Sequence, residues 1–251
     1  MSGHSHWATI RRKKGAADAK RGAIFTRLAR EIVIAAREGG GDPGSNFRLA
    51  LAVEKARAGN MPKDGIERAI RRGTGEDKEG AAFDEITYEG YGPHGVAMMI
   101  ACVTDNRNRT VSEVRHILSK HGGSMGEVGS VGWQFDRVAY FSFPSSALGY
   151  DKAFELAIEA GADDVNEDDG YIEITGPVES FKDIADRLHQ AKVSPEDAEL
   201  RLVAKQEMDL GVEETLQVMK VIEALEDFDD VQNVYHNLNM SDEALAALEA
   251  E

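Results

Sequence analysis

The first third of the chain carries apolar residues at helical spacing. The longest such stretch runs from about Ala16 to Glu38 and ends at glycines 39–41, which are typical of a helix stop. At 100° per residue its apolar side chains share one sector of a helical wheel: Ile24, Phe25, Leu28, Ile32, Ala35 and Ala36. Its basic side chains fall on the other side: Lys20, Arg27, Arg30 and Arg37. We therefore expect one face to pack and the opposite face to be cationic.

Two shorter helices are expected to follow. One begins near Ser45 or Asn46, and the next runs from Pro62 to Gly73. Proline is favoured in the first turn of a helix and glycine just past its end, so both boundaries have a physical reason. The sequence thus predicts a small three-helix unit.

Beyond residues 73–81 the pattern changes to short β-like runs that alternate with helices, which indicates an α+β fold. In the middle of this part, strands are expected at 140–143, 163–165, 171–175 and 200–204, with helices at 151–160 and 180–191. The order βαββαβ is that of a ferredoxin-like split βαβ unit.

The segments on either side of this unit carry further elements. Strands are expected at 83–88, 96–103, 131–135 and 231–235, and helices at 111–119 and 213–225. These elements can close into one more α/β unit with the βαββαβ segment inserted in it. Sequential domains without an insertion are equally compatible with the pattern.

Charge is distributed unevenly along the chain. In total 29 Lys+Arg oppose 45 Asp+Glu, a net charge of −16, which would repel a polyanion if it were evenly spread. Residues 1–72, however, hold 16 basic and 7 acidic residues, a net +9, whereas residues 73–251 hold 13 and 38, a net −25. Such asymmetry is typical of a protein in which one part binds nucleic acid.

The basic residues of the first part are candidate phosphate contacts, because Lys and Arg that neutralise phosphates release counterions. An ordinary solvated surface is the alternative. Trp7, beside the first basic cluster, is either a base-stacking residue or a packing anchor. The candidate nucleic-acid-binding residues are Arg11, Arg12, Lys13, Lys14, Lys20, Arg21, Arg27, Arg30, Arg37, Lys63, Arg68, Arg71 and Arg72.

A second candidate site is the polar segment 104–110, between an expected strand and an expected helix. Asn106, Arg107, Asn108 and Arg109 are placed to contact phosphate or a protein partner, since the start of a helix favours anions. The alternative is that Asn108 or Thr110 simply caps the helix. The residues alone do not favour one interpretation over the other.

Several functional classes find little support. The single cysteine, Cys102, rules out a disulfide within the chain, and no apolar run reaches the 18 or so residues of a membrane span. His4 and His6 lack further metal ligands nearby, and the acidic run 164–170 departs from a calcium loop. No catalytic constellation stands out. We expect a cytoplasmic, non-enzymatic monomer that needs no cofactor or metal and does not contact membranes.

Long, ordered motifs of this chain resemble the YebC/PmpR family. They lie at residues 3–7, 18–22, 39–43, 60–64, 88–93, 104–110 and 129–135. Departures are small: His6 stands where the family commonly has Lys, and Gly132-Trp133-Gln134 stands where Ser-Trp-Met is usual. The resemblance covers nearly the whole chain.

The resemblance implies an architecture of three domains, with the third inserted in the second. We accordingly expect an N-terminal three-helix domain followed by two ferredoxin-like α/β domains, one inserted in the other. The expected bounds are 1–80 for the basic helical domain, 81–136 plus 207–251 for the second, and 137–206 for the inserted βαββαβ domain.

The resemblance also implies a function in gene expression. Members are described as probable transcriptional regulators that bind DNA. A mitochondrial relative activates translation of cytochrome oxidase, and bacterial ones are linked to ribosomes stalled at proline-rich sequences. We therefore expect a bacterial regulator that binds DNA through its basic domain. The alternatives are a ribosome-associated translation factor that contacts ribosomal or transfer RNA, and a protein-interaction scaffold.

Overall fold

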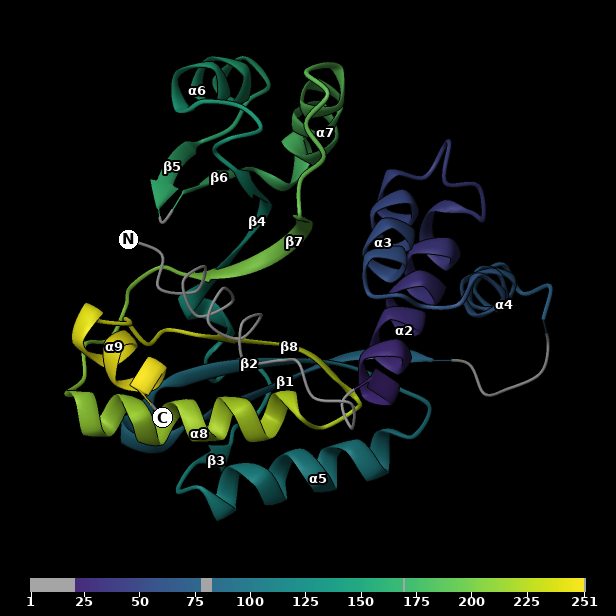
Figure 1. Cartoon of the computed structure of the whole chain (residues 1–251). Coiled ribbons are helices and arrows are strands. Elements are labelled where there is room, and N and C mark those ends of the chain that lie inside the picture. Colours follow the sequence, from purple (N-terminus) through teal and green to yellow (C-terminus); the bar gives the residue numbers. More distant parts are fainter. Residues whose placement is uncertain (1–20, 78–82, 169, 251) are drawn as a thin grey trace. The chain divides into compact units, whose positions relative to one another are not determined.

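The computed structural model of the chain describes residues 21–77, 83–168 and 170–250 (Figure 1). It divides into two compact units, one made of residues 136–203 and the other of the residues before and after them. No helix within the described ranges is both long and apolar enough to cross a bilayer.

Within residues 21–77 the N-terminal part forms three helices, as the periodicity predicts. They are α2 (Arg21–Gly39), α3 (Phe47–Ala58) and α4 (Lys63–Thr74). Their shared core holds Ile32 and Leu49, both fully buried. Gly73 lies so close to α2 that an added Cβ would come within 2.5 Å of the Val33 carbonyl oxygen, so a side chain there would push α4 off α2.

Asn46 fixes the junction between α2 and α3. Its Oδ1 accepts a hydrogen bond from the Leu49 N–H (3.0 Å), which makes it the N-cap of α3. Its Nδ2 donates to the carbonyl oxygens of Ala35 (2.7 Å), in the last turns of α2, and of Gly40 (2.8 Å), just past the end of that helix. One buried side chain thus ends one helix and begins the next.

The first α/β unit is built on a four-stranded sheet in the order β3-β1-β2-β8. Helices α5 and α8 contribute to its core, which includes the buried side chains of Ile100, Leu118 and Ile222. The connection β2–α5–β3 encloses β1 and is therefore a split βαβ. Its elements are β1 (Asp84–Tyr91), β2 (Ala97–Thr104), α5 (Arg107–Lys120), β3 (Ser124–Met125), α8 (Val212–Glu226), β8 (Val231–His236) and α9 (Asp242–Ala250).

Residues 136–203 form the second α/β unit, whose sheet order is β5-β6-β4-β7. This is the order of a ferredoxin-like βαββαβ unit, with α6 and α7 packed together (Figure 1). Phe141 stacks on Phe181 at 4.9 Å between ring centroids. The elements are β4 (Phe135–Pro144), α6 (Tyr150–Glu159), β5 (Asp164–Asp168), β6 (Tyr171–Gly176), α7 (Phe181–Gln190) and β7 (Asp197–Ala204).

The α+β fold class, with one α/β unit inserted in the other, is confirmed. The exact bounds 1–80, 81–136 plus 207–251, and 137–206 stay a prediction. The strand expected at 131–135 is wrong, because Gly132–Gln134 forms a 3-10 helix and β4 begins only at Phe135. The short strand β3 and the helix α9 were not predicted.

Candidate nucleic-acid interface

Part of the predicted nucleic-acid site lies outside the described residues. This holds for Arg11, Arg12, Lys13, Lys14 and Lys20, and also for His4, His6 and Trp7. Arg21 is the first residue of α2, without a described side chain. Phosphate contact by these residues stays a prediction.

Five basic side chains of α3 and α4 are exposed, and one of them, Arg48, pairs with Glu38. We refer to the other four as the α3–α4 cations: Arg57, Lys63, Arg68 and Arg71. On α4, Arg68 and Arg71 lie on the side opposite the buried Ile66 and Ala69, and Lys63 is the first residue of the helix. The ion pair of Lys63 with Glu67 is 3.6 Å long, and both side chains are more than half exposed, so it holds Lys63 only weakly. These cations are available to neutralise phosphates.

Arg72 is less available, because its guanidinium packs on an aromatic ring. It lies 4.1 Å from the centroid of the Phe83 ring, and the guanidinium of Arg30 lies 5.4 Å from the same centroid. Such cation–π contacts stabilise packing when the cation is partly desolvated. Arg72 therefore joins the N-terminal helices to the segment that leads into β1.

The cationic face expected on α2 is wrong in the structure. Arg30 is only 7% exposed, and Arg27 is half-buried with its Nη2 donating to the Glu226 carbonyl oxygen at 2.6 Å. Arg37 is more exposed but pairs with Glu85 at 2.7 Å. The α2 arginines thus contact the first α/β unit instead of forming an open surface. Nucleic-acid contact by them stays a prediction, with the burial of Arg30 against it.

Asp230 is the centre of a buried polar cluster that receives Arg30. Its carboxylate, in a residue 1% exposed, accepts from Arg30 Nη2 at 2.9 Å and from Arg109 Nη2 at 2.8 Å. Two buried hydroxyls also donate to it, Thr104 Oγ1 at 3.1 Å and Thr110 Oγ1 at 2.8 Å. Arg30 additionally donates to the Asp229 carbonyl oxygen. A buried carboxylate satisfied by two guanidiniums and two hydroxyls fixes its neighbours in one arrangement.

The pKa of Asp230 depends on two opposing effects, its burial and its positively charged and hydrogen-bonding neighbours. Burial alone would raise the pKa, but hydrogen bonds from Arg109 and Thr110 and the charges of Arg30 and Arg109 outweigh burial and lower it below the ordinary value of 3.8. The ionised carboxylate therefore stabilises the folded chain above pH 3.8, and this stabilisation is lost as the pH falls through the lowered pKa.

A pH-dependent stability difference is expected from this cluster. Asp230→Asn should be destabilised at neutral pH. Its difference from the wild type in unfolding free energy should shrink as the pH falls below about 4, because the Asp230 carboxylate then takes up a proton in the unfolded chain before it does in the folded chain, where its pKa is lower. Urea unfolding followed by circular dichroism, from about pH 7 to about pH 3, measures this difference. A difference that stays constant over the whole range would contradict the assignment.

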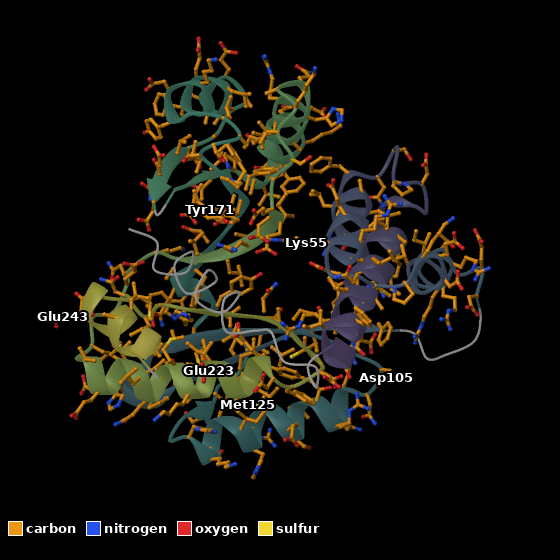
Figure 2. The ribbon with its side chains drawn as sticks, viewed as in Figure 1. Lys55, Asp105, Met125, Tyr171, Glu223 and Glu243 are labelled. Atoms are coloured by element: carbon orange, nitrogen blue, oxygen red, sulfur yellow. The ribbon has the colours of Figure 1, made fainter. Side chains whose placement is uncertain are left out.

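The segment 104–110 is organised around the same cluster. Asn106 is the N-cap of α5, with its Oδ1 accepting from the Arg109 N–H at 3.1 Å, so the expected capping by Asn108 or Thr110 is wrong. Arg107 pairs with Asp84 at 2.9 Å, and Arg109 also reaches Asp105 at 3.0 Å (Figure 2). Asn108 is exposed. Phosphate or partner contact by Asn106, Arg107, Asn108 and Arg109 stays a prediction.

Sequence reasoning missed Asp230 altogether. The available signal is the segment Asp227-Phe228-Asp229-Asp230 directly before strand β8, because a carboxylate that is buried at the start of a strand requires hydrogen-bonded or charged partners. No group of three or more His, Cys, Asp or Glu side chains in the described part of the chain is arranged to hold a metal ion. Residues 164–168 of the acidic run form β5, which pairs with β6.

Two family models match the chain. The model described as the TACO1/YebC protein N-terminal domain matches residues 5–76, and the one described as the TACO1/YebC second and third domain matches residues 83–238. Together they span all but the ends of the chain and a short segment before β1.

Curated relatives match over their full length. A probable transcriptional regulatory protein of Chlorobaculum tepidum is 49% identical over 252 residues, covering 100% of both chains. One of Borrelia turicatae is 52% identical over 243 residues, covering 97% of this chain and 99% of the relative. A conserved hypothetical protein of Aquifex aeolicus has a similar crystal structure, with a TM-score of 0.81 and 41% identity over 90% of this chain and 93% of that one.

Proposed function

Because this chain belongs to the TACO1/YebC family, we propose that it is a non-enzymatic regulator of gene expression that binds nucleic acid through its N-terminal helical part. Relatives named probable transcriptional regulatory proteins make DNA the first candidate partner. The observation that carries the proposal is the charge separation, net +9 in residues 1–72 against −25 in the remainder. The phosphates of a polyanion are attracted to the first part, which therefore supplies the phosphate contacts, whereas the net charge of the second part does not favour such contacts.

The proposed contacts are the α3–α4 cations together with the basic residues that precede α2. Their exposure lets the α3–α4 cations approach phosphates without breaking an internal network. Arg30 and Arg109 both donate to the carboxylate of Asp230. We propose a different role for these two cations, which is to hold α2 and α5 against the start of β8. The proposal requires no cofactor or metal, places the protein in the bacterial cytoplasm and takes it as a monomer.

A second candidate function is a ribosome-associated translation factor that contacts ribosomal or transfer RNA. The exposed face of α4 favours it, because the acidic Asp64 and Glu67 lie there between the basic Lys63, Arg68 and Arg71. Such a face suits scattered phosphate contacts, which position a protein but carry no base sequence. DNA binding is accordingly expected to be only weakly sequence-selective.

Cross-linking in cells, followed by sequencing of the bound DNA and RNA, tests the proposal and separates its two forms. Enrichment of promoter DNA would support the transcriptional form, and enrichment of ribosomal or transfer RNA the translational one. A matched control is a strain whose protein carries neutral residues in place of the α3–α4 cations. If the wild type enriches neither DNA nor RNA over a strain that lacks the protein, the proposed function is wrong. If the wild type and the control strain enrich the same nucleic acid equally, the α3–α4 cations are not the contact.

A further inference from the structure

The loop that leads from β3 to the 3-10 helix before β4 is held by one carboxylate. Glu89 on β1 accepts the N–H of Gly129 at 2.7 Å through Oε1, and the N–H groups of Val131 and Gly132, both at 2.8 Å, through Oε2. The backbone carbonyl oxygen of Glu89 accepts the N–H of Gly126 at 2.8 Å, directly after β3. Burial would raise the pKa of Glu89, but these three backbone hydrogen bonds lower it, so the carboxylate is charged near neutral pH.

This well-supported loop nevertheless presents large apolar side chains to solvent. Trp133 is 69% exposed and Val128 is 97% exposed. Tryptophan usually buries much of its large apolar surface, and leaving it in water forfeits that stabilisation. The loop conformation is set by Glu89 and does not depend on packing of the indole. The loop conformation that Glu89 stabilises therefore keeps the side chain of Trp133 exposed.

The indole of Trp133 offers only its ring face to a ligand. Its single donor, Nε1–H, already donates to the Ser130 carbonyl oxygen at 3.1 Å, and the Tyr91 hydroxyl donates to the same oxygen at 3.1 Å. This internal hydrogen bond also fixes the orientation of the ring. A partner that recognises this side chain must use a flat, apolar surface and not a hydrogen bond to the indole nitrogen.

We propose that Trp133 stacks on an unpaired base of the nucleic acid that the helical part binds. Every nucleobase carries a π-face, so an oriented indole whose donor is occupied recognises bases without regard to sequence. The inference rests on the proposed function and narrows its substrate class. The favoured ligand contains unpaired bases, as a single strand or an RNA loop does, because the bases of an uninterrupted duplex are already stacked on each other.

Intrinsic fluorescence tests the stacking directly. The chain has two tryptophans, so Trp7→Phe leaves Trp133 as the only indole in the full-length protein. Titration with a single-stranded uridine oligonucleotide should quench the emission of Trp133, whereas a fully paired duplex of equal length should leave it unchanged. Quenching by both ligands alike, or by neither when both bind, would overturn the inference.

Affinity measurements provide the second readout. Trp133→Ala in the otherwise wild-type chain should weaken binding of the single strand between about 5-fold and 150-fold, the range for loss of one base–aromatic stack, and Trp133→Phe should restore most of it. Duplex affinity should not change. The matched control is Phe154→Ala, which removes a 44% exposed aromatic side chain from α6. Circular dichroism checks that both variants fold.

The outcomes separate this inference from the proposed function. If the wild type binds the single strand and Trp133→Ala binds it equally well, the stacking role is wrong while nucleic-acid binding stands. The stacking role is also wrong if Trp133→Ala weakens binding of the single strand and the duplex to the same extent. If the wild type binds neither ligand, the proposed function is overturned and the inference with it.

Discussion

Asp230→Ala is expected to lower the free energy of unfolding by about 3–5 kcal/mol. The substitution leaves the guanidinium of Arg30, 7% exposed, without its carboxylate, and it removes the acceptor of the Thr104 and Thr110 hydroxyls. An uncompensated buried charge accounts for most of this cost, because its desolvation is no longer balanced by a partner. Urea unfolding at neutral pH measures the loss.

Two further variants separate this effect from a general loss of packing. Asp229→Ala alters the exposed neighbour and should change stability by less than about 0.5 kcal/mol. Arg30→Met combined with Asp230→Ala should be more stable than the single Asp230→Ala variant, because the unpaired cation is gone. If the free energy of unfolding of the double variant is instead lowered by the sum of the decreases in the two single variants, the two side chains do not stabilise the fold as a pair.

Elements whose signals are local could be predicted from the sequence. Helix α3 begins where Asn46 offers a capping side chain, and α4 begins directly after Pro62. The βαββαβ order could be predicted because each strand and helix of that unit carries its own apolar period within a few residues. The resulting sheet order follows from the few connections that such a sequence of elements allows.

Features that depend on distant partners could not be predicted. Arg30 falls opposite the apolar sector of α2, but its acceptor Asp230 lies 200 residues further along the chain. The expected strand at 131–135 fails for the same reason, since the N–H groups of Val131 and Gly132 bond to Glu89 instead of a neighbouring strand. The periodicity of a sequence indicates which side chains will pack in a core, but it does not indicate which polar groups will form hydrogen bonds or ion pairs with each other.

Replacing all four α3–α4 cations by Gln is expected to weaken nucleic-acid binding about 10³-fold at about 0.1 M salt. The estimate follows from counterion release, which contributes about 0.9 units of log–log salt slope for each phosphate contact on duplex DNA. Since Arg57, Lys63, Arg68 and Arg71 are exposed, the substitutions should leave folding intact. Circular dichroism and the melting temperature check this point.

A control variant loses the same number of positive charges at other positions. It shows whether binding depends on where the charges lie or only on the net charge. Arg115, Lys120, Lys152 and Lys182 are exposed and lie outside the helical part. Their replacement by Gln should weaken binding only slightly, through the overall field of the protein. Equal losses in the two variants would mean that net charge, and not the α3–α4 surface, governs binding.

The salt dependence of binding tests the central claim most directly. A labelled duplex DNA and a labelled structured RNA are titrated with the wild type, the α3–α4 variant and the control variant between about 50 mM and about 200 mM salt. The wild type and the control should show a steep linear fall of log affinity with log salt. On the duplex, the α3–α4 variant should have a slope smaller by about 3.6. A flat salt dependence of the wild type, or an unchanged slope in the α3–α4 variant, would contradict nucleic-acid binding through this surface.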